Sequence, residues 1–238
     1  MKFVKTASEK DFVFIARGFI IDTFAASACP HMTFPTGNTP KPLYASFDPK
    51  GDFAGLSWQF SQLDEYTGLK AGDPRNFGDW LRRDLLDPLY LPEKNRLMFD
   101  PYATDFDAEL LRYRTEFAKR GALDVAFLGV GATGHLGLND PPATPLDETR
   151  IVPIKGKSYE GNLDYWTGDE YSHLPPLPLS LTGYTLGMKE ILEAQHVVVM
   201  LRNKPALLER IEQTIKPDRN FPVSLLRAHK NTTILSLG

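Results

Sequence analysis

Residues 124–142 read DVAFLGVGATGHLGLNDPP, and this stretch decides the fold. It opens on an apolar run of strand length, residues 124–130, which predicts a buried strand. Positions 129–142 then bring together four glycines, one histidine, one acidic residue and a double proline, a composition typical of a loop. The histidine and the acidic residue suggest that this loop carries chemistry.

The same alternation of short apolar runs with amphipathic segments extends outward in both directions. We expect strands at 31–34, 56–63, 96–99, 124–130, 196–201 and 232–237. We expect helices at 9–27, 41–47, 76–90, 105–121, 184–194, 204–215 and 221–229. Strands that alternate with helices predict an α/β fold, in which a mostly parallel, Rossmann-like sheet has helices on both faces and the active site lies at the C-terminal ends of the strands. We expect one domain over 1–238; residues 155–180 fit no pattern, and a lid over the site is one interpretation of them.

Composition excludes several classes of protein. The chain has 238 residues, 42% of them hydrophobic, and a net charge of −3 without a long Lys/Arg run, so we expect neither nucleic acid nor a membrane as partner. The apolar runs are too short to span a bilayer. The single cysteine, Cys29, fits a reducing compartment, and the N-terminus lacks the apolar segment of a signal peptide. We therefore expect a cytoplasmic protein; assembly into a homo-oligomer stays open.

His135 is the candidate catalytic residue of the opening stretch. Glycines such as Gly131 let the backbone approach a ligand closely, and an imidazole at a strand end suits proton exchange near neutral pH. Asp140, five residues on, can orient the imidazole and fix its tautomer. The spacing matches neither the dinucleotide fingerprint nor the Walker loop, and the other histidines show no ligand spacing, so no cofactor and no metal are expected.

The stretch TGNTP, which follows the strand at 31–34, is a candidate anion site. Thr39 is expected to cap the next helix, with Pro40 at its first position, and the N–H groups at such a helix start attract phosphate. An ordinary capped turn without a ligand is the alternative. Lys204, at the start of the helix after HVVVML, can add a positive charge to a phosphate pocket, or it is a solvated surface lysine.

Asp64 and Glu65 follow the strand at 56–63. A carboxylate at the dry end of a strand can acquire a raised pKa and move protons to and from carbon. Neighbouring strand residues point to opposite sides, so only one of the two acids can face a pocket. The alternative is a loop acid that caps the following turn.

Taken together, PTGNTP, LDEYTGL, LGVGATGHLGLNDPP and YTLGMKEILEAQHVVVMLRNKPALLER resemble, in this order, the motifs of the glucosamine-6-phosphate deaminases, with their galactosamine-6-phosphate relatives and the more distant 6-phosphogluconolactonases. The resemblance covers most of the chain. It implies an aldose–ketose isomerisation with loss of ammonia from an amino-hexose 6-phosphate by acid–base catalysis, with a small sugar phosphate as partner and no cofactor.

The resemblance also implies a role for each matching residue. Asp64 would move a proton between C2 and C1 of the open-chain sugar, His135 would assist ring opening, and Asp140 would orient the imidazole. The residues implied to bind the phosphate are Thr36, Gly37, Asn38, Thr39 and Lys204.

Three departures from the family pattern stand out. Thr133 occupies a position that is acidic in many members, which predicts an altered pH profile, and Asp140 is one methylene shorter than the usual glutamate. No arginine matches the one that some members carry near 155–170; Asp164 falls there, and Lys155 and Lys157 are the candidate substitutes.

Two alternatives follow from these observations. One is a 6-phosphogluconolactonase-like hydrolase on the same scaffold, which the DEY and LND-P elements disfavour. The other is a sugar-phosphate sensor with a decayed active site, against which the retained Asp64 and His135 argue. The gluco or galacto configuration of the sugar stays open, with GHLGLN resembling the galactosamine branch.

Overall fold

The computed structural model describes residues 1–48, 50–53, 55–156, 160, 173–178 and 180–238. The segment 155–180, for which a lid is one interpretation, lies largely outside the described residues. Lys157 and Asp164 lie there too.

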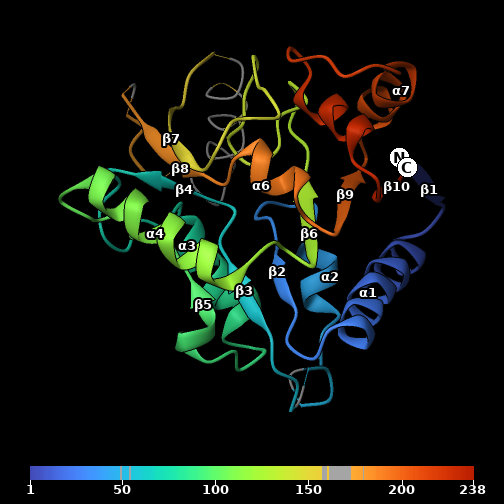
Figure 1. Cartoon of the computed structure of the whole chain (residues 1–238), viewed down its shortest axis with the longest axis horizontal. Coiled ribbons are helices and arrows are strands. Elements are labelled where there is room, and N and C mark those ends of the chain that lie inside the picture. The colour runs from blue at the N-terminus through green and yellow to red at the C-terminus, as the bar shows by residue number, and fades with distance from the viewer. Residues whose placement is uncertain (49, 54, 157–159, 161–172, 179) are drawn as a thin grey trace.

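Seven strands form one parallel sheet, in the spatial order β1-β10-β9-β6-β2-β3-β5 (Figure 1). Their bounds are β1 (Lys2–Thr6), β2 (His31–Thr33), β3 (Gln59–Ser61), β5 (Arg96–Leu97), β6 (Val125–Gly129), β9 (His196–Arg202) and β10 (Thr232–Leu237). A second, antiparallel sheet has the order β4-β8-β7, with bounds β4 (Asp64–Thr67), β7 (Arg150–Pro153) and β8 (Thr182–Thr185).

Helices join these strands. The α-helices are α1 (Glu9–Ala26), α2 (Lys41–Ala45), α3 (Phe77–Leu81), α4 (Phe106–Arg120), α6 (Met188–Leu192) and α7 (Pro205–Gln213). Shorter or wider helical segments are η1 (Arg82–Leu86), η2 (Glu93–Asn95) and η3 (Pro222–Ala228). The predicted α/β fold is therefore confirmed: a mostly parallel sheet carries helices on both of its faces.

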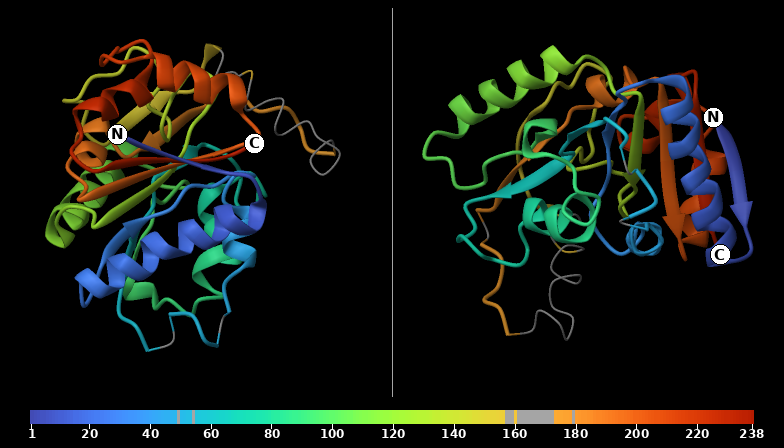
Figure 2. Two further views of the ribbon diagram at one scale, coloured as in Figure 1. Left: turned by 90° about the vertical axis from the view of Figure 1, so that its right-hand side faces the viewer. Right: turned by 90° about the horizontal axis from the view of Figure 1, so that it is seen from below.

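Two apolar cores lie on opposite faces of the main sheet, because neighbouring strand residues point in opposite directions. In β6, Val125 and Phe127 belong to the core that α1 and α2 cover, while Ala126 and Leu128 belong to the core that α4, α6 and α7 cover. Figure 2 shows α1 and α7 on opposite sides of the sheet. A strand buried on both faces explains why residues 124–130 form a continuous apolar run and do not alternate with polar residues.

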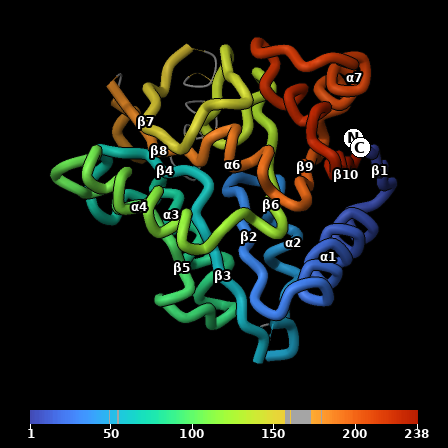
Figure 3. Tube along the Cα trace, in the orientation of Figure 1, coloured from blue at the N-terminus to red at the C-terminus, as the bar shows by residue number. Residues whose placement is uncertain are grey.

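The position of the site follows from the strand order. The chain runs from β2 outward through β3 to β5, then returns to β6, which lies directly beside β2 and leads outward on the other side through β9 (Figure 3). The loops after β2 and β6 therefore leave the sheet in opposite directions. In open α/β sheets, such a reversal opens a crevice at the C-terminal strand ends, where ligands bind.

Several expectations about single elements were wrong. Asp64–Thr67 is a strand of the small sheet, where a loop was expected, and β3 is shorter than the predicted 56–63. Residues 184–194 divide into the end of β8 and the helix α6. The sequence did not predict strands β1, β7 and β8. Strands β1 and β7 lie at sheet edges and are partly exposed, and β8 contains a glycine, so none of the three has a continuous apolar run.

The expected cap by Thr39 is also wrong. Helix α2 begins at Lys41 with Pro40, not Thr39, in the capping position, and no side chain caps it. Thr39 lines the cavity described below.

Candidate active site

A cavity of about 600 Å³ opens at the C-terminal edge of the main sheet. Its walls come from the segments that follow β2, β3, β6 and β9, which are far apart in the sequence. The predicted site residues among its lining are Thr36, Gly37, Asn38, Thr39, Asp64, Gly131, His135 and Lys204. Asp140 does not line the cavity and contacts His135 from behind.

The His135 ring packs closely against Gly131. A Cβ built on Gly131 would lie 2.1 Å from Cε1 and Nε2 of the imidazole, so a larger residue there would displace the ring. The loop is closed by two backbone hydrogen bonds, from the Gly131 amide to the His135 carbonyl (3.1 Å) and from the Gly134 amide to the Gly131 carbonyl (2.9 Å). Because it has no side chain, Gly131 leaves the space that the imidazole of His135 occupies.

Two side chains meet Nδ1 of His135. The Thr133 hydroxyl lies 2.8 Å from Nδ1, and Oδ1 of Asp140 lies 3.2 Å from it. The same hydroxyl donates to Asp140 Oδ1 at 3.1 Å. Nδ1 is therefore the ring nitrogen that faces Thr133 and Asp140.

Asp64 is the buried acid of the cavity. It is the first residue of β4, it is only 7% exposed, and it lies three positions after the last residue of β3, at the C-terminal edge of the main sheet. Burial raises the pKa of Asp64 to about 8, and the neighbouring Glu65 charge adds to this shift. A carboxylate with such a pKa is a far stronger base than an exposed aspartate and can take a proton from carbon.

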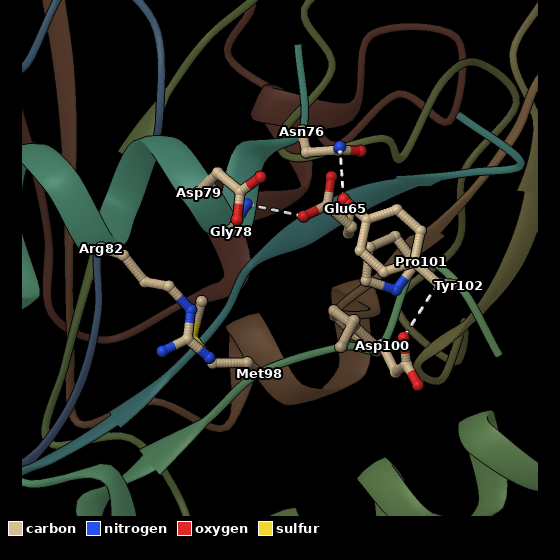
Figure 4. Close-up of a pocket in the computed structure, with 10 residues that line it drawn as sticks. Glu65, Asn76, Gly78, Asp79, Arg82, Met98, Asp100, Pro101 and Tyr102 are labelled. Atoms are coloured by element: carbon tan, nitrogen blue, oxygen red, sulfur yellow. Dashed lines mark hydrogen bonds between the residues drawn. The ribbon is translucent and has the colours of Figure 1, made fainter. Parts of the chain in front are cut away.

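Glu65 points to the opposite side of β4, as the strand alternation requires. It lines a second cavity of about 330 Å³ together with residues of α3 and the 98–102 segment (Figure 4). Its carboxylate accepts backbone hydrogen bonds from Tyr66, Phe77 and Gly78 at 2.6–2.8 Å. Burial raises the pKa of Glu65 to about 7, although these donors oppose the shift. Glu65 therefore ties the start of α3 to β4, and of the pair Asp64 alone faces the larger cavity.

The cavity also contains an anion-attracting end. Gly37 has a φ of +91°, which permits the tight turn of the TGNT loop, and no hydrogen bond within the described chain engages the hydroxyls of Thr36 or Thr39. Lys204 Nζ donates to the Val130 carbonyl at 2.7 Å, and burial lowers the pKa of this lysine.

Sequence reasoning missed several residues of the cavity. Arg202 stands two positions before Lys204 and lines the same cavity, while its guanidinium lies 3.3 Å from Glu9. Trp80 of α3 lines the wall, and its indole N–H is buried without a partner in the described structure. The RNK tripeptide was a sequence signal for Arg202, whereas the amphipathic pattern of 76–90 gave no sign that Trp80 borders a ligand site.

Other properties of the described part of the chain bear on ligands. No three His, Cys, Asp or Glu side chains gather there as a metal site would require. None of the helices described has the length and apolarity needed to cross a membrane.

The fold and the cavity together define an α/β enzyme with a buried carboxylate and an imidazole at the switch point of its sheet. No family model matches the chain. Curated relatives named glucosamine-6-phosphate deaminase do match: one from Listeria monocytogenes is 31% identical over 205 residues, which cover 84% of this chain and 81% of the relative. Another, from Halalkalibacterium halodurans, is 27% identical over 242 residues, which cover 99% of this chain and 95% of the relative. The chain belongs to the glucosamine-6-phosphate deaminase family.

Solved structures agree on the fold. A monomeric glucosamine-6-phosphate deaminase superposes with a TM-score of 0.86 at 23% identity, and the match covers 100% of this chain and 97% of that one. The 6-phosphogluconolactonase from Thermotoga maritima superposes with a TM-score of 0.77 at 15% identity, over 100% and 99% of the two chains.

Proposed function

We propose that this protein converts an amino-hexose 6-phosphate, with water, into a ketohexose 6-phosphate and ammonia. The observation that carries the proposal is the single cavity in which Asp64, His135 and the TGNT loop meet. Family membership supports the same reaction, because the relatives named above are glucosamine-6-phosphate deaminases.

In this proposal, the phosphate lies at the anion-attracting end. Thr36 and Thr39 offer hydroxyl donors, and Lys204 and Arg202 offer positive charge. Arginine is well suited to two-point contact with phosphate oxygens. A bound phosphate holds the reacting carbons C1 and C2 at a fixed distance from this end of the cavity. Phosphate binding therefore orients these carbons toward the catalytic residues.

His135 would open the sugar ring. With Nδ1 engaged by Thr133 and Asp140, Nε2 of the neutral imidazole accepts the proton of the anomeric hydroxyl and returns it to the ring oxygen as the C1–O5 bond breaks. The product of this step is an aldehyde at C1, with the amine still on C2.

Asp64 would then carry the isomerisation. Its carboxylate removes the proton from C2 while the ammonium form of the substrate amine gives a proton to the aldehyde oxygen, which yields an enol-amine, and the carboxylate then returns its proton to C1. The resulting iminium at C2 adds water and releases ammonia, so that a ketone remains. The dry surroundings of Asp64 make its carboxylate basic enough for this step.

The test is an assay of ammonia release from glucosamine-6-phosphate and galactosamine-6-phosphate with wild type and Asp64→Asn. Wild type is expected to turn over at least one of the two sugars. Asp64→Asn is expected to lose at least about a hundredfold in kcat, the scale of one general-base contribution, while binding of the sugar phosphate by calorimetry stays within a fewfold. Hydrolysis of 6-phosphogluconolactone without ammonia release would contradict the proposal, as would binding without turnover at any pH.

A further inference from the structure

Thr133 stands between the two groups of the acid–histidine pair. Its hydroxyl contacts Nδ1 of His135 at 2.8 Å and Asp140 Oδ1 at 3.1 Å, whereas Asp140 itself approaches Nδ1 only to 3.2 Å. Of these two contacts to Nδ1, the shorter one thus comes from a neutral hydroxyl and not from the acid.

The Thr133 hydroxyl has a single proton, and this determines which partner donates in its hydrogen bonds to Asp140 and His135. A threonine hydroxyl has one proton to donate and two lone pairs to accept with. The hydroxyl donates to Oδ1 of Asp140, and this bond uses its single proton. Its lone pairs then face Nδ1, which must carry a proton to complete the contact.

We propose that Thr133 is a positioning residue that relays the orienting effect of Asp140 to His135 and holds the imidazole as the Nδ1–H tautomer. Aspartate is one methylene shorter than glutamate, and the Thr133 hydroxyl spans the remaining gap between the Asp140 carboxylate and the imidazole. It does so without adding a charge beside the ring. Gly131 beneath the ring and the bridge behind it together fix the direction of Nε2.

The surroundings of the ring make the absence of a second charge consequential. The charged groups on the described segments around it are Asp140 behind the ring and Asp64, Lys204 and Arg202 along the cavity. A carboxylate in place of the Thr133 hydroxyl would favour the imidazolium, which cannot accept a proton. The Thr133 hydroxyl adds no such charge.

The inference rests on the proposed function for its kinetic consequence but not for its structural one, and three variants test both. Thr133→Val keeps the shape and removes the bridge, Thr133→Ser keeps the hydroxyl, and Thr133→Asp adds a charge. Thr115→Val, which removes an exposed hydroxyl on α4, is the matched control.

The kinetic readout is the pH profile of kcat and KM for the amino-hexose phosphate. Thr133→Val is expected to lower kcat about tenfold to a hundredfold, the cost of leaving a hydrogen-bonding group without its partner, with KM nearly unchanged. Thr133→Ser is expected to restore most of kcat. Thr133→Asp places a carboxylate beside the ring and is expected to change the pH profile of kcat relative to wild type. Wild-type kcat and an unmoved profile in Thr133→Val would overturn the proposal.

A second measurement needs no substrate. Long-range ¹H–¹⁵N spectra of the free protein, with His135→Asn to assign the ring signals, are expected to show the Nδ1–H tautomer in wild type and Thr133→Ser and a mixture in Thr133→Val. An unchanged tautomer in Thr133→Val would overturn the bridge. A changed tautomer in a protein that releases no ammonia would support the bridge and overturn the proposed function.

Discussion

At the scale of single residues, burial sets the chemistry of Asp64. An exposed aspartate is fully ionised at neutral pH and is a weak base. In the dry end of β4, next to another acid, the pKa rises to about 8, so the carboxylate ionises only near the upper end of the physiological range.

The first prediction concerns the pH dependence of activity. Below about pH 8, each unit of pH should lower kcat/KM about tenfold, because the ionised fraction of a group falls tenfold per unit below its pKa. Initial rates in constant-ionic-strength buffers measure this limb. A profile that stays flat from pH 6 to pH 8 would speak against Asp64 as the base.

Replacement of the neighbouring acid provides the second prediction. The Glu65 charge contributes to the raised pKa of Asp64, so Glu65→Gln should shift the limb of kcat/KM to lower pH. Circular dichroism must accompany the kinetics, because Glu65 also holds the amides of Phe77 and Gly78. A folded Glu65→Gln variant with an unmoved limb would show that the two carboxylates do not interact.

The same burial predicts a stability cost, which is the third prediction. The folded-state pKa of Asp64 exceeds its ordinary value of 3.8. The contribution of Asp64 to the free energy of unfolding is therefore fully present below pH 3.8 and is lost as the pH rises from 3.8 to about 8. Asp64→Asn, which cannot ionise, should therefore gain stability over wild type by up to about 1.4 kcal/mol per pH unit between pH 5 and pH 8. Urea melts at both pH values measure the difference; an equal difference at both would contradict this account.

At the scale of elements, the loop after β6 owes its shape to glycines with distinct requirements. Gly134 has a φ of +83°, and a Cβ there would lie 2.3 Å from the Phe221 ring, which is buried and has the Arg210 guanidinium 3.9 Å from its centre. The ring cannot move aside. Gly18, in the middle of α1, has nothing within 4 Å of an added Cβ.

The two glycines therefore provide a matched pair, which is the fourth prediction. Gly134→Ala should lower the free energy of unfolding by about 2–4 kcal/mol, from left-handed strain plus overpacking. Gly18→Ala should raise it by about 1 kcal/mol through helix propensity. Denaturant melts of both variants measure the changes; equal effects would show that backbone geometry at 134 is not the constraint.

The elements also show what sequence reasoning can reach. Strands such as β6 and β9 were predictable because burial on both faces leaves a continuous apolar run, and α4 was predictable down to its stop at Gly121. The small sheet was not, because Asp64–Thr67 and Thr182–Thr185 carry polar residues and glycine whose burial depends on partners distant in the chain. The sequence marked Thr133 as a departure from the family pattern, but the contacts of its hydroxyl with both His135 and Asp140 required coordinates.

At the scale of the whole molecule, one sheet serves two cores. Phe127 stacks on Phe34 in one core, at 5.0 Å between ring centres, while its neighbour Leu128 is buried in the other. Each central strand thus contributes to both cores, so we expect the chain to unfold as one unit.

That expectation gives the fifth prediction. Phe127→Ala and Leu128→Ala should each lower the free energy of unfolding by about 2–5 kcal/mol, although they empty cores on opposite faces. Far-ultraviolet circular dichroism and the fluorescence of tryptophans, among them the buried Trp58, should follow a single transition in both variants. Two separate transitions would indicate that the cores fold independently.

The alternation of side chains along β4 limits the insertions and deletions that the chain can accept just before this strand. Asp64 and Glu65 project to opposite sides of β4. Inserting or deleting one residue between Ser61 and Asp64 would move each of these side chains to the other side of the strand. Glu65 would then face the larger cavity, and Asp64 would point to the opposite side of the strand. A change of two residues would preserve the parity, so variation at this join should proceed in steps of two.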